Sequence, residues 1–357
     1  MQNYNEIALS GEEKIIYSLR SLYKASGYSQ FKMSKFEEYD LYGKNKDFLI
    51  NDAVITFTDA YGKLMALKPD VTFSIIKNCT DEIGRVKRVC YNENVYRMSE
   101  GDHEFTEIMQ SGIECIGDID TYNIYEVLSL AKQSLGIITD EYVLDMSHLG
   151  FVEGLISDIG DCDIDAVLKC IGEKNAHGLG ELLGDRATKL QTLTGLYGSF
   201  DAVIPELEKL CVNKKCEDAL AEIKALAELF EGEDGIKLDF SVISSVNYYN
   251  GIVFKGFVNG VPNAVLSGGR YDKLMKKLGK KSGAVGFAVY HDRLKYLDYK
   301  KEAQKKPVLV LYNENSNVKE LIAQRDRLIS EGIAFELQKN ASDKQAYSDT
   351  IDLRAKE

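Results

Sequence analysis

Two glycine-bounded strands separated by a short lysine-rich helix constrain the fold of this chain most. An apolar run leads into residues 268–270 (GGR), a helix pattern with several lysines follows, and a second strand pattern at 283–289 runs into a helix that carries Arg293. Just upstream, residues 248–254 (YYNGIVF) form another apolar run. Glycines in strands allow a ligand or a neighbouring strand to approach the backbone closely. On the residues alone, the pattern predicts a folded α/β element.

The composition is that of an ordinary globular chain and argues against several classes of protein. Its 357 residues are 45% hydrophobic and 28% charged, which suits one large domain with one or two smaller ones. The sequence shows neither a long apolar run nor a signal-peptide core, so a cytoplasmic protein without membrane contact is expected. The cysteines form no CxxC pair and the histidines lack metal-ligand spacing, so no metal site is expected. A formal net charge of −12 argues against tRNA as a partner.

The rest of the sequence alternates between helical and strand patterns, which predicts an α+β fold. Ser10 and Glu13 have the spacing of a capping box and precede apolar residues at helical spacing. Residues 53–67 have the signature of a β-hairpin with its turn near Gly62. Further strands are expected at 85–98, 107–117 and 142–146, helices at 10–27, 121–135 and 217–231, and a helix-rich insertion at about 161–235.

One expected strand carries polar side chains on a single face. Gln110, Gly112 and Glu114 alternate along it, so they point to the same side. An amide and a carboxylate suit a pocket, because the glycine leaves space between two polar anchors. An exposed sheet edge has the same polarity and stays an alternative. Upstream, Asp70 follows a proline and can cap a helix, which is a sufficient role on local grounds.

These segments resemble the catalytic core of class II histidyl-tRNA synthetases. Residues 248–254, 266–270 and 283–294 are similar to the YYTGTVFE, GGGRYD and GFAIGLERL segments of that family, in the same order. Residues 67–72 are similar to its RPDLT segment, and residues 95–117 are similar to its motif 2. The resemblance implies a class II synthetase-like core, in which helices flank an antiparallel sheet.

The resemblance also implies a binding site for histidine. That site would contain Asp70, Thr72, Arg97, Gln110, Glu114, Tyr248 and Tyr249. In the family pattern the arginine and the glutamine would face the ligand's carboxylate, the aspartate and the threonine its ammonium group, and Glu114 with Tyr248 its imidazole. One fixed cation, two carboxylates and several neutral hydrogen-bonding groups suit a zwitterion with a basic side chain.

The resemblance is weaker where the family binds and activates ATP. Arg97 and Arg293 match two of its arginines and could form a vestigial nucleotide site. Ser244 stands where the family has a catalytic arginine, and Thr106 stands where it has an arginine that contacts the nucleotide. Tyr290 replaces a glycine next to the expected adenine. Adenylation needs cations to stabilise phosphates. These replacements therefore imply a pocket that binds an amino acid without activating it.

Two parts of unequal size are implied by the same resemblance. Residues 1–300 would form the synthetase-like core, including the insertion. Within it, an extended segment at 31–42 occupies the place of motif 1, the family's dimer-forming element, although Ser34 replaces its proline. Residues 307–357 resemble the start of the family's anticodon-binding domain and contain one βαβ pattern, but they are too few for the whole domain.

This combination is most similar to the regulatory subunits of short-form ATP phosphoribosyltransferase, a synthetase-like family of histidine biosynthesis. That resemblance implies a chain without catalysis or cofactor, which dimerises, assembles with the short catalytic subunit, activates it and transmits feedback inhibition by histidine. Histidine could bind in the synthetase-like pocket or at a subunit boundary. Two alternatives stay open: a diverged histidyl-tRNA synthetase or other amino-acid-activating enzyme, and an amino-acid sensor without this partner.

Overall fold

The computed structural model describes residues 10–45, 54–80, 84–98, 104–243, 248–295, 297, 306–340 and 346–354. The chain divides into two compact units, one formed by residues 15–296 and the other by residues 1–14 and 297–357. Among the described helices, none combines the length and the apolar character needed to cross a membrane.

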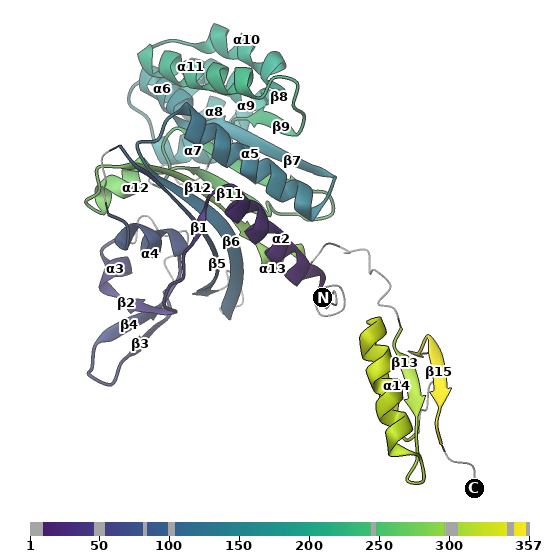
Figure 1. Ribbon diagram of the computed structural model, residues 1–357. Coiled ribbons are helices and arrows are strands. Elements are labelled where there is room, and N and C mark those ends of the chain that lie inside the picture. Colours follow the sequence, from purple (N-terminus) through teal and green to yellow (C-terminus); the bar gives the residue numbers. More distant parts are fainter. Residues whose placement is uncertain are drawn as a thin grey trace. The chain divides into compact units, whose positions relative to one another are not determined.

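A large sheet, which has nine strands over the described residues, is the framework of the larger unit (Figure 1). Its strand order is β1-β5-β6-β12-β11-β10-β7-β9-β8. The strands are β1 (Ser29–Gln30), β5 (Val86–Met98), β6 (Phe105–Gly117), β7 (Tyr142–His148), β8 (Tyr197–Gly198), β9 (Ile236–Asp239), β10 (Ile252–Val258), β11 (Leu266–Arg270) and β12 (Gly283–Tyr290). The pairs β1–β5 and β7–β9 are parallel, and the other neighbours are antiparallel. The antiparallel core expected from the sequence is present, with one parallel pair towards each edge.

The longest hairpin of this sheet is made of β5 and β6, which have 13 residues each and pair along their whole length. Side chains of β6 alternate between its two faces. Cys115 lies on the face of helix α5 (Thr121–Ile138), where Glu126 is among its neighbours. Gln110 and Glu114 lie on the opposite face, so the sequence prediction of a polar face on this strand is confirmed.

Helices cover both faces of the large sheet. Besides α5, they include α2 (Gly11–Ala25), α4 (Val71–Lys77), α12 (Asp272–Lys277) and α13 (His291–Leu294). On one face, α5 lies across β6, β12, β11, β10 and β7 (Figure 1), and Tyr23 Oη of α2 lies 2.9 Å from Ser134 Oγ of α5. On the other face, α4, α12 and β5 share an apolar core that includes Phe73, Tyr91 and Leu274. The polar face of β6 lies on this second side.

Local structure near the N-terminus follows the sequence closely. In the capping box, Ser10 N donates to Glu13 Oε2 at 2.9 Å and Glu13 N donates to Ser10 Oγ at 3.3 Å. The predicted hairpin is confirmed, because β3 (Thr56–Thr58) pairs with β4 (Leu64–Leu67) in an antiparallel manner. Asp59 Oδ1 accepts hydrogen bonds from two backbone N–H groups in the turn. A third strand, β2 (Phe36–Glu38), pairs with β4 and completes a small sheet.

The segment expected to be extended at 31–42 is extended only in part. Residues 40–43 form the short helix α3 (Asp40–Gly43). The backbone N–H groups of Tyr42 and Gly43 both donate to Tyr39 O, at 2.9 and 2.8 Å. These bonds turn the chain away from the strand direction directly after β2.

The expected insertion is helical. Its helices are α7 (Ile164–Gly172), α8 (Ala176–Leu183), η2 (Gly184–Ala187), α9 (Thr188–Gly195), α10 (Phe200–Leu210) and α11 (Lys214–Leu229). Of these, α7, α8 and α11 begin at side-chain caps. Asp163, Asn175 and Asn213 each accept a hydrogen bond from a backbone N–H three residues on, at 2.8 to 3.1 Å. Such caps satisfy the unpaired donors at a helix start. Helix α11 packs on α6 (Leu149–Ile159).

The second unit contains a helix and a three-stranded parallel sheet. Its elements are β13 (Val308–Leu311), α14 (Val318–Glu331), β14 (Phe335–Gln338) and β15 (Asp349–Asp352). The predicted βαβ unit is confirmed by the parallel pairing of β13 with β14. The sequence prediction missed β15, which pairs with the other edge of β13. An acid at each end of this four-residue strand hides its strand character in the sequence.

Candidate functional site

A pocket on the α4 side of the large sheet contains all seven residues predicted to bind histidine. Asp70 and Thr72 come from the start of α4, Arg97 from β5, Gln110 and Glu114 from β6, and Tyr248 and Tyr249 from the segment before β10. Sequence reasoning missed several other lining residues, namely Tyr91, Ser267, Tyr271 and Phe287, whereas Tyr290, expected next to an adenine, lines this same pocket. The fold therefore brings the predicted set together, and its role in binding histidine stays a prediction.

Glu114 is the most deeply buried carboxyl group of the pocket. Its side chain accepts hydrogen bonds from Thr72 Oγ1 at 2.8 Å and from Tyr271 Oη at 2.5 Å. Burial raises the pKa of Glu114 to about 8, although these two hydroxyl donors oppose the shift. Gly286 on the neighbouring strand makes room for this side chain, because a Cβ there would lie 1.9 Å from Glu114 Oε2. At neutral pH the pocket thus holds a protonated carboxyl group.

Asp70 caps α4 and also faces the pocket, and its role in holding an ammonium group stays a prediction. One oxygen, Oδ1, accepts from Phe73 N at 3.1 Å and caps α4. The other, Oδ2, lies 4.0 Å from the Arg97 guanidinium, which itself donates through Nε to Pro69 O at 2.9 Å. Burial raises the pKa of Asp70, and the charge of Arg97 opposes that shift. Capping therefore leaves one carboxylate oxygen facing the pocket's cation.

Gln110 brings a buried donor that the described part of the protein does not use. The residue is 4% exposed and lines the pocket. Its Nε2 atom has no hydrogen-bond partner among the described residues. Because an unpaired buried polar group costs free energy, this donor indicates a site shaped for an acceptor that arrives from outside.

The glycine between these two polar anchors does not leave space for a ligand, so that prediction is wrong. A Cβ on Gly112 would lie 2.3 Å from Phe287 O and 2.4 Å from Tyr91 Oη. The space beside Gly112 is therefore filled by the Tyr91 ring and the neighbouring backbone. The glycine serves close packing of the sheet against Tyr91 rather than ligand access.

Tyrosine rings narrow the pocket. The ring centres of Tyr248 and Tyr249 are 4.6 Å apart, and those of Tyr248 and Tyr271 are 5.9 Å apart. The cavity volume between the lining side chains is about 30 Å³. Burial holds the pKa of all three hydroxyls well above the usual value, so they remain hydrogen-bond donors. The rings therefore restrict the space that is open to a ligand.

The two arginines proposed for a vestigial nucleotide site are not in equivalent positions. Arg97 lines the pocket, whereas Arg293 is not among its described lining residues. The guanidinium of Arg293 lies 4.4 Å from the ring centre of Tyr290 and donates a hydrogen bond to Ala264 O. Thr106 lies on β6, and Ser244 falls outside the described residues. No group of three or more His, Cys, Asp or Glu side chains in the described part of the chain is placed to hold a metal ion.

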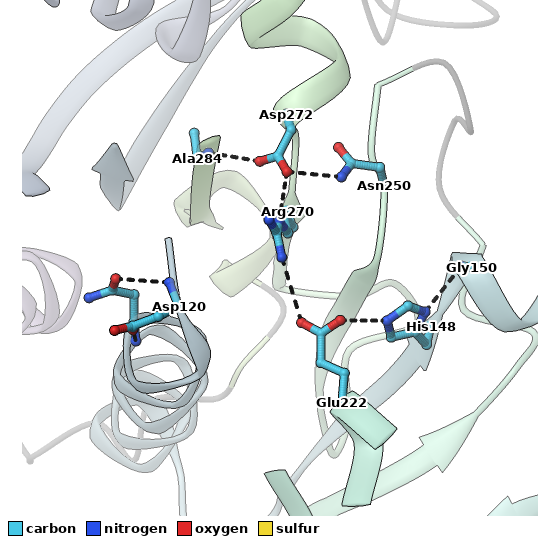
Figure 2. Close-up of polar contacts among 9 residues, drawn as sticks. Asp120, His148, Gly150, Glu222, Asn250, Arg270, Asp272 and Ala284 are labelled. Carbon is cyan, nitrogen blue, oxygen red and sulfur yellow. Dashed lines mark hydrogen bonds and ion pairs between the residues drawn. The ribbon is translucent and has the colours of Figure 1, made fainter. Parts of the chain in front are cut away.

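A polar network fixes the segment that carries the pocket tyrosines. Figure 2 shows Asp272, at the start of α12, between three partners. Its Oδ2 atom accepts from Arg270 Nε at 2.8 Å and from Asn250 Nδ2 at 3.3 Å, and its Oδ1 atom accepts from Ala284 N at 3.0 Å. Asn250 directly follows Tyr249. The carboxylate thus ties the tyrosine segment to the ends of β11 and β12.

The same network reaches the helical insertion. Arg270 Nη1 lies 3.8 Å from Glu222 Oε1 on α11, and Glu222 Oε2 lies 2.8 Å from His148 Nε2 (Figure 2). Gly150 N donates to His148 Nδ1 at 3.1 Å, so Nε2 carries the proton that points at Glu222. Burial alone would raise the pKa of Glu222, but its hydrogen bond with His148 keeps that pKa below the usual value. An ionised Glu222 therefore connects the insertion to the pocket segment through Arg270.

Replacing Asp272 with asparagine should lower the free energy of unfolding by about 1–3 kcal/mol, because a charge-assisted contact is lost and buried donors lose an acceptor. Urea unfolding at pH 7, followed by circular dichroism, measures this change. Asp326→Asn is the matched control, since its ion pair with Arg325 is exposed and should contribute under about 1 kcal/mol. Equal stabilities for the two variants would show that Asp272 does not hold this segment.

The sequence comparisons point to a known family. A family model described as histidyl-tRNA synthetase matches residues 2–294. A curated relative from Ruminiclostridium cellulolyticum, named ATP phosphoribosyltransferase regulatory subunit, is 29% identical over 287 residues, which are 76% of this chain and 68% of the relative. A relative of the same name from Clostridium kluyveri is 28% identical over 92% of this chain and 89% of its own length.

A structural comparison gives the same fold. A crystal structure described as an ATP phosphoribosyltransferase regulatory subunit/histidyl-tRNA synthetase from Bacillus halodurans has a TM-score of 0.80 to this chain. The match covers 99% of this chain and 96% of the other, with 24% identity. The family model spans every segment that builds the pocket. The chain therefore belongs to the histidyl-tRNA synthetase family.

Proposed function

We propose that this chain is the regulatory subunit of a short-form ATP phosphoribosyltransferase and does not catalyse a reaction itself. The names of its curated relatives support this function. The structural observation that carries the proposal is a contrast between two neighbouring regions. The amino-acid pocket keeps its full set of charged and hydrogen-bonding side chains, whereas Arg293, the family's nucleotide arginine, is bound to Tyr290 and to Ala264 O.

The ligand of the pocket is free histidine, which acts as the feedback inhibitor. Arg97 and the unpaired Nε2 of Gln110 supply donors for its carboxylate. Asp70 and Thr72 supply acceptors for its ammonium group, and Tyr249 lines the same pocket. Glu114 and Tyr248 face the imidazole, whose two nitrogens need one donor and one acceptor in the neutral form. Charge-assisted contacts of this kind contribute roughly 1.5–3 kcal/mol each.

Amino-acid activation is absent because the cations that would stabilise a reacting triphosphate are missing. Thr106 and Ser244 occupy two positions where the family has arginines. Arg293 is already engaged by a backbone oxygen and an aromatic ring. Removing preorganised cations from a phosphoryl or adenylyl transfer site costs orders of magnitude in rate. No cofactor is required for a subunit that only binds histidine.

The subunit works in a cytoplasmic hetero-oligomer. Residues 1–300 form the synthetase-like core, which dimerises through its antiparallel sheet region, and residues 307–357 form a small α/β segment. The core assembles with the short catalytic subunit and activates the transfer of phosphoribosyl to ATP in that partner. Neither a membrane nor tRNA takes part.

Reconstitution tests this function. Mixing the purified chain with a short-form catalytic subunit from the same organism should raise phosphoribosyl transfer to ATP by an order of magnitude or more, and added histidine should inhibit the mixture. Neither protein alone should show comparable activity. The competing function predicts a different result: histidine-dependent exchange between ATP and pyrophosphate by the chain alone would identify an amino-acid-activating enzyme and overturn the proposal.

A further inference from the structure

A second cavity lies at the end of the large sheet, where β5 begins, β6 ends and β12 begins. Gly117 marks this position, because it pairs with Val86 on one side and with Gly283 on the other. The cavity volume is about 250 Å³, much larger than that of the tyrosine pocket. Thr80, from the segment after α4, and Ser282, directly before β12, line it together with residues of β5 and β6.

The charged side chains among the described residues that line this cavity are cations. Arg85 and Lys87 line it, and its described lining residues include no carboxylate. Lys280 Nζ donates to Cys79 O, which places a third cation next to Thr80. Burial raises the pKa of the Cys79 thiol, and Lys87 and Lys280 both oppose that shift, which is consistent with two ammonium groups converging there. This concentration of positive charge is notable in a chain with a net charge of −12.

The backbone around the cavity is tightly constructed. Gly117 has a φ of +150°, and a Cβ at this position would lie 2.2 Å from Arg85 O. Gly84 N, just before β5, donates to Asp118 Oδ2, just after β6, at 3.1 Å. This hydrogen bond joins the start of β5 to the end of β6. The segment that carries Arg85 and Lys87 is therefore held against the end of β6.

We propose that this cavity binds a phosphate group carried by a small organic molecule. Arg and Lys side chains with hydroxyl donors are the groups that bind phosphate oxygens in proteins. With a volume of about 250 Å³, the cavity has room for an organic group beside the phosphate. This site is separate from the tyrosine pocket and does not depend on the function proposed for that pocket.

Calorimetric titration of the full chain with two probes tests this site, namely ribose 5-phosphate and inorganic phosphate. Ribose 5-phosphate should bind more tightly than inorganic phosphate. Arg85→Ala/Lys87→Ala should weaken its binding by about a hundredfold, or roughly tenfold for each charge-assisted contact removed. The matched control is Lys209→Ala/Lys224→Ala, which removes two exposed cations that pair with Glu206 and Glu208 on the insertion. This control should bind like the wild type.

Several results would overturn the site. If neither probe binds at millimolar concentration, the proposed site does not exist. The same conclusion follows if the two double variants lose equal affinity for ribose 5-phosphate. Equal affinity for the two probes would contradict the proposal that the site also recognises the organic part of its ligand. A change in molar mass of the Arg85→Ala/Lys87→Ala variant, measured by light scattering, would instead identify this surface as a subunit interface. Histidine titration of the same variant should match the wild type, which separates a failure of this site from a failure of the proposed function.

Discussion

Glu114→Gln should make the protein more stable at alkaline pH while it weakens histidine binding. The native carboxyl group has a pKa of about 8, against 4.5 for the ordinary group. Between these values the folded chain holds a proton that the unfolded chain has released, so wild-type stability falls as pH rises through this window. The full cost above pH 8 is on the order of 5 kcal/mol. Glutamine is neutral and can keep bonds to Thr72 and Tyr271, so the variant avoids this loss.

Thermal unfolding of both proteins between pH 5 and pH 9 measures this effect. The two melting temperatures should be similar near pH 5 and should diverge as pH rises, with the variant several degrees higher at pH 8.5. Calorimetry should show that the variant binds histidine about tenfold more weakly, because a neutral hydrogen bond to the imidazole is lost. Glu173→Gln is the control, because Glu173 is exposed on the insertion, and it should change neither quantity. Parallel pH profiles for wild type and Glu114→Gln would contradict the buried, protonated carboxyl group.

Arg97→Met should nearly abolish histidine binding, with an affinity loss of about a hundredfold or more. The guanidinium is the cation expected to face the ligand's carboxylate, and it also lies 4.0 Å from Asp70 Oδ2. Without it, burial would raise the pKa of Asp70 without opposition from this charge, and a protonated Asp70 is a poor partner for an ammonium group. One substitution therefore weakens the contacts to both ends of the zwitterion.

Arg88→Met provides a matched control for that prediction. Arg88 lies on the same strand, but its side chain forms an ion pair with Glu126 at 2.9 Å and is not among the described residues that line the pocket. Calorimetric titration with histidine at pH 7.5 should give wild-type affinity for Arg88→Met and little measurable binding for Arg97→Met. Comparable affinities in the two variants would place histidine elsewhere, for example at a subunit boundary.

The set of pocket residues could be predicted from the family resemblance, and local rules account for the positions of Gln110, Glu114 and Asp70. Strand alternation places Gln110 and Glu114 on one face, and the proline before Asp70 places its carboxylate at a helix start. The glycines of the predicted strand at 283–289 also indicated a close approach to its backbone. In the structure, Gly286 makes room for the Glu114 side chain. These features depend on neighbours within a few positions along the chain.

Other features depend on contacts between distant segments, which no local pattern records. Tyr271 donates to a carboxylate 157 positions away in the sequence, and Arg270 reaches Glu222 on the insertion. The space beside Gly112 looked available for a ligand because nothing in the sequence indicates that Tyr91 fills it. Strand β15 was missed because its pairing with the buried strand β13, rather than an alternating pattern of its own, makes it a strand.

The central claim is that the tyrosine pocket is where histidine controls a partner enzyme. Histidine inhibition curves of the reconstituted phosphoribosyltransferase test it most directly, with wild-type chain in one assay and Glu114→Gln chain in the other. Both chains should activate the catalytic subunit equally in the absence of histidine. The inhibition curve of the Glu114→Gln complex should shift to about tenfold higher histidine concentration. Superimposable curves would show that the pocket does not carry the feedback signal.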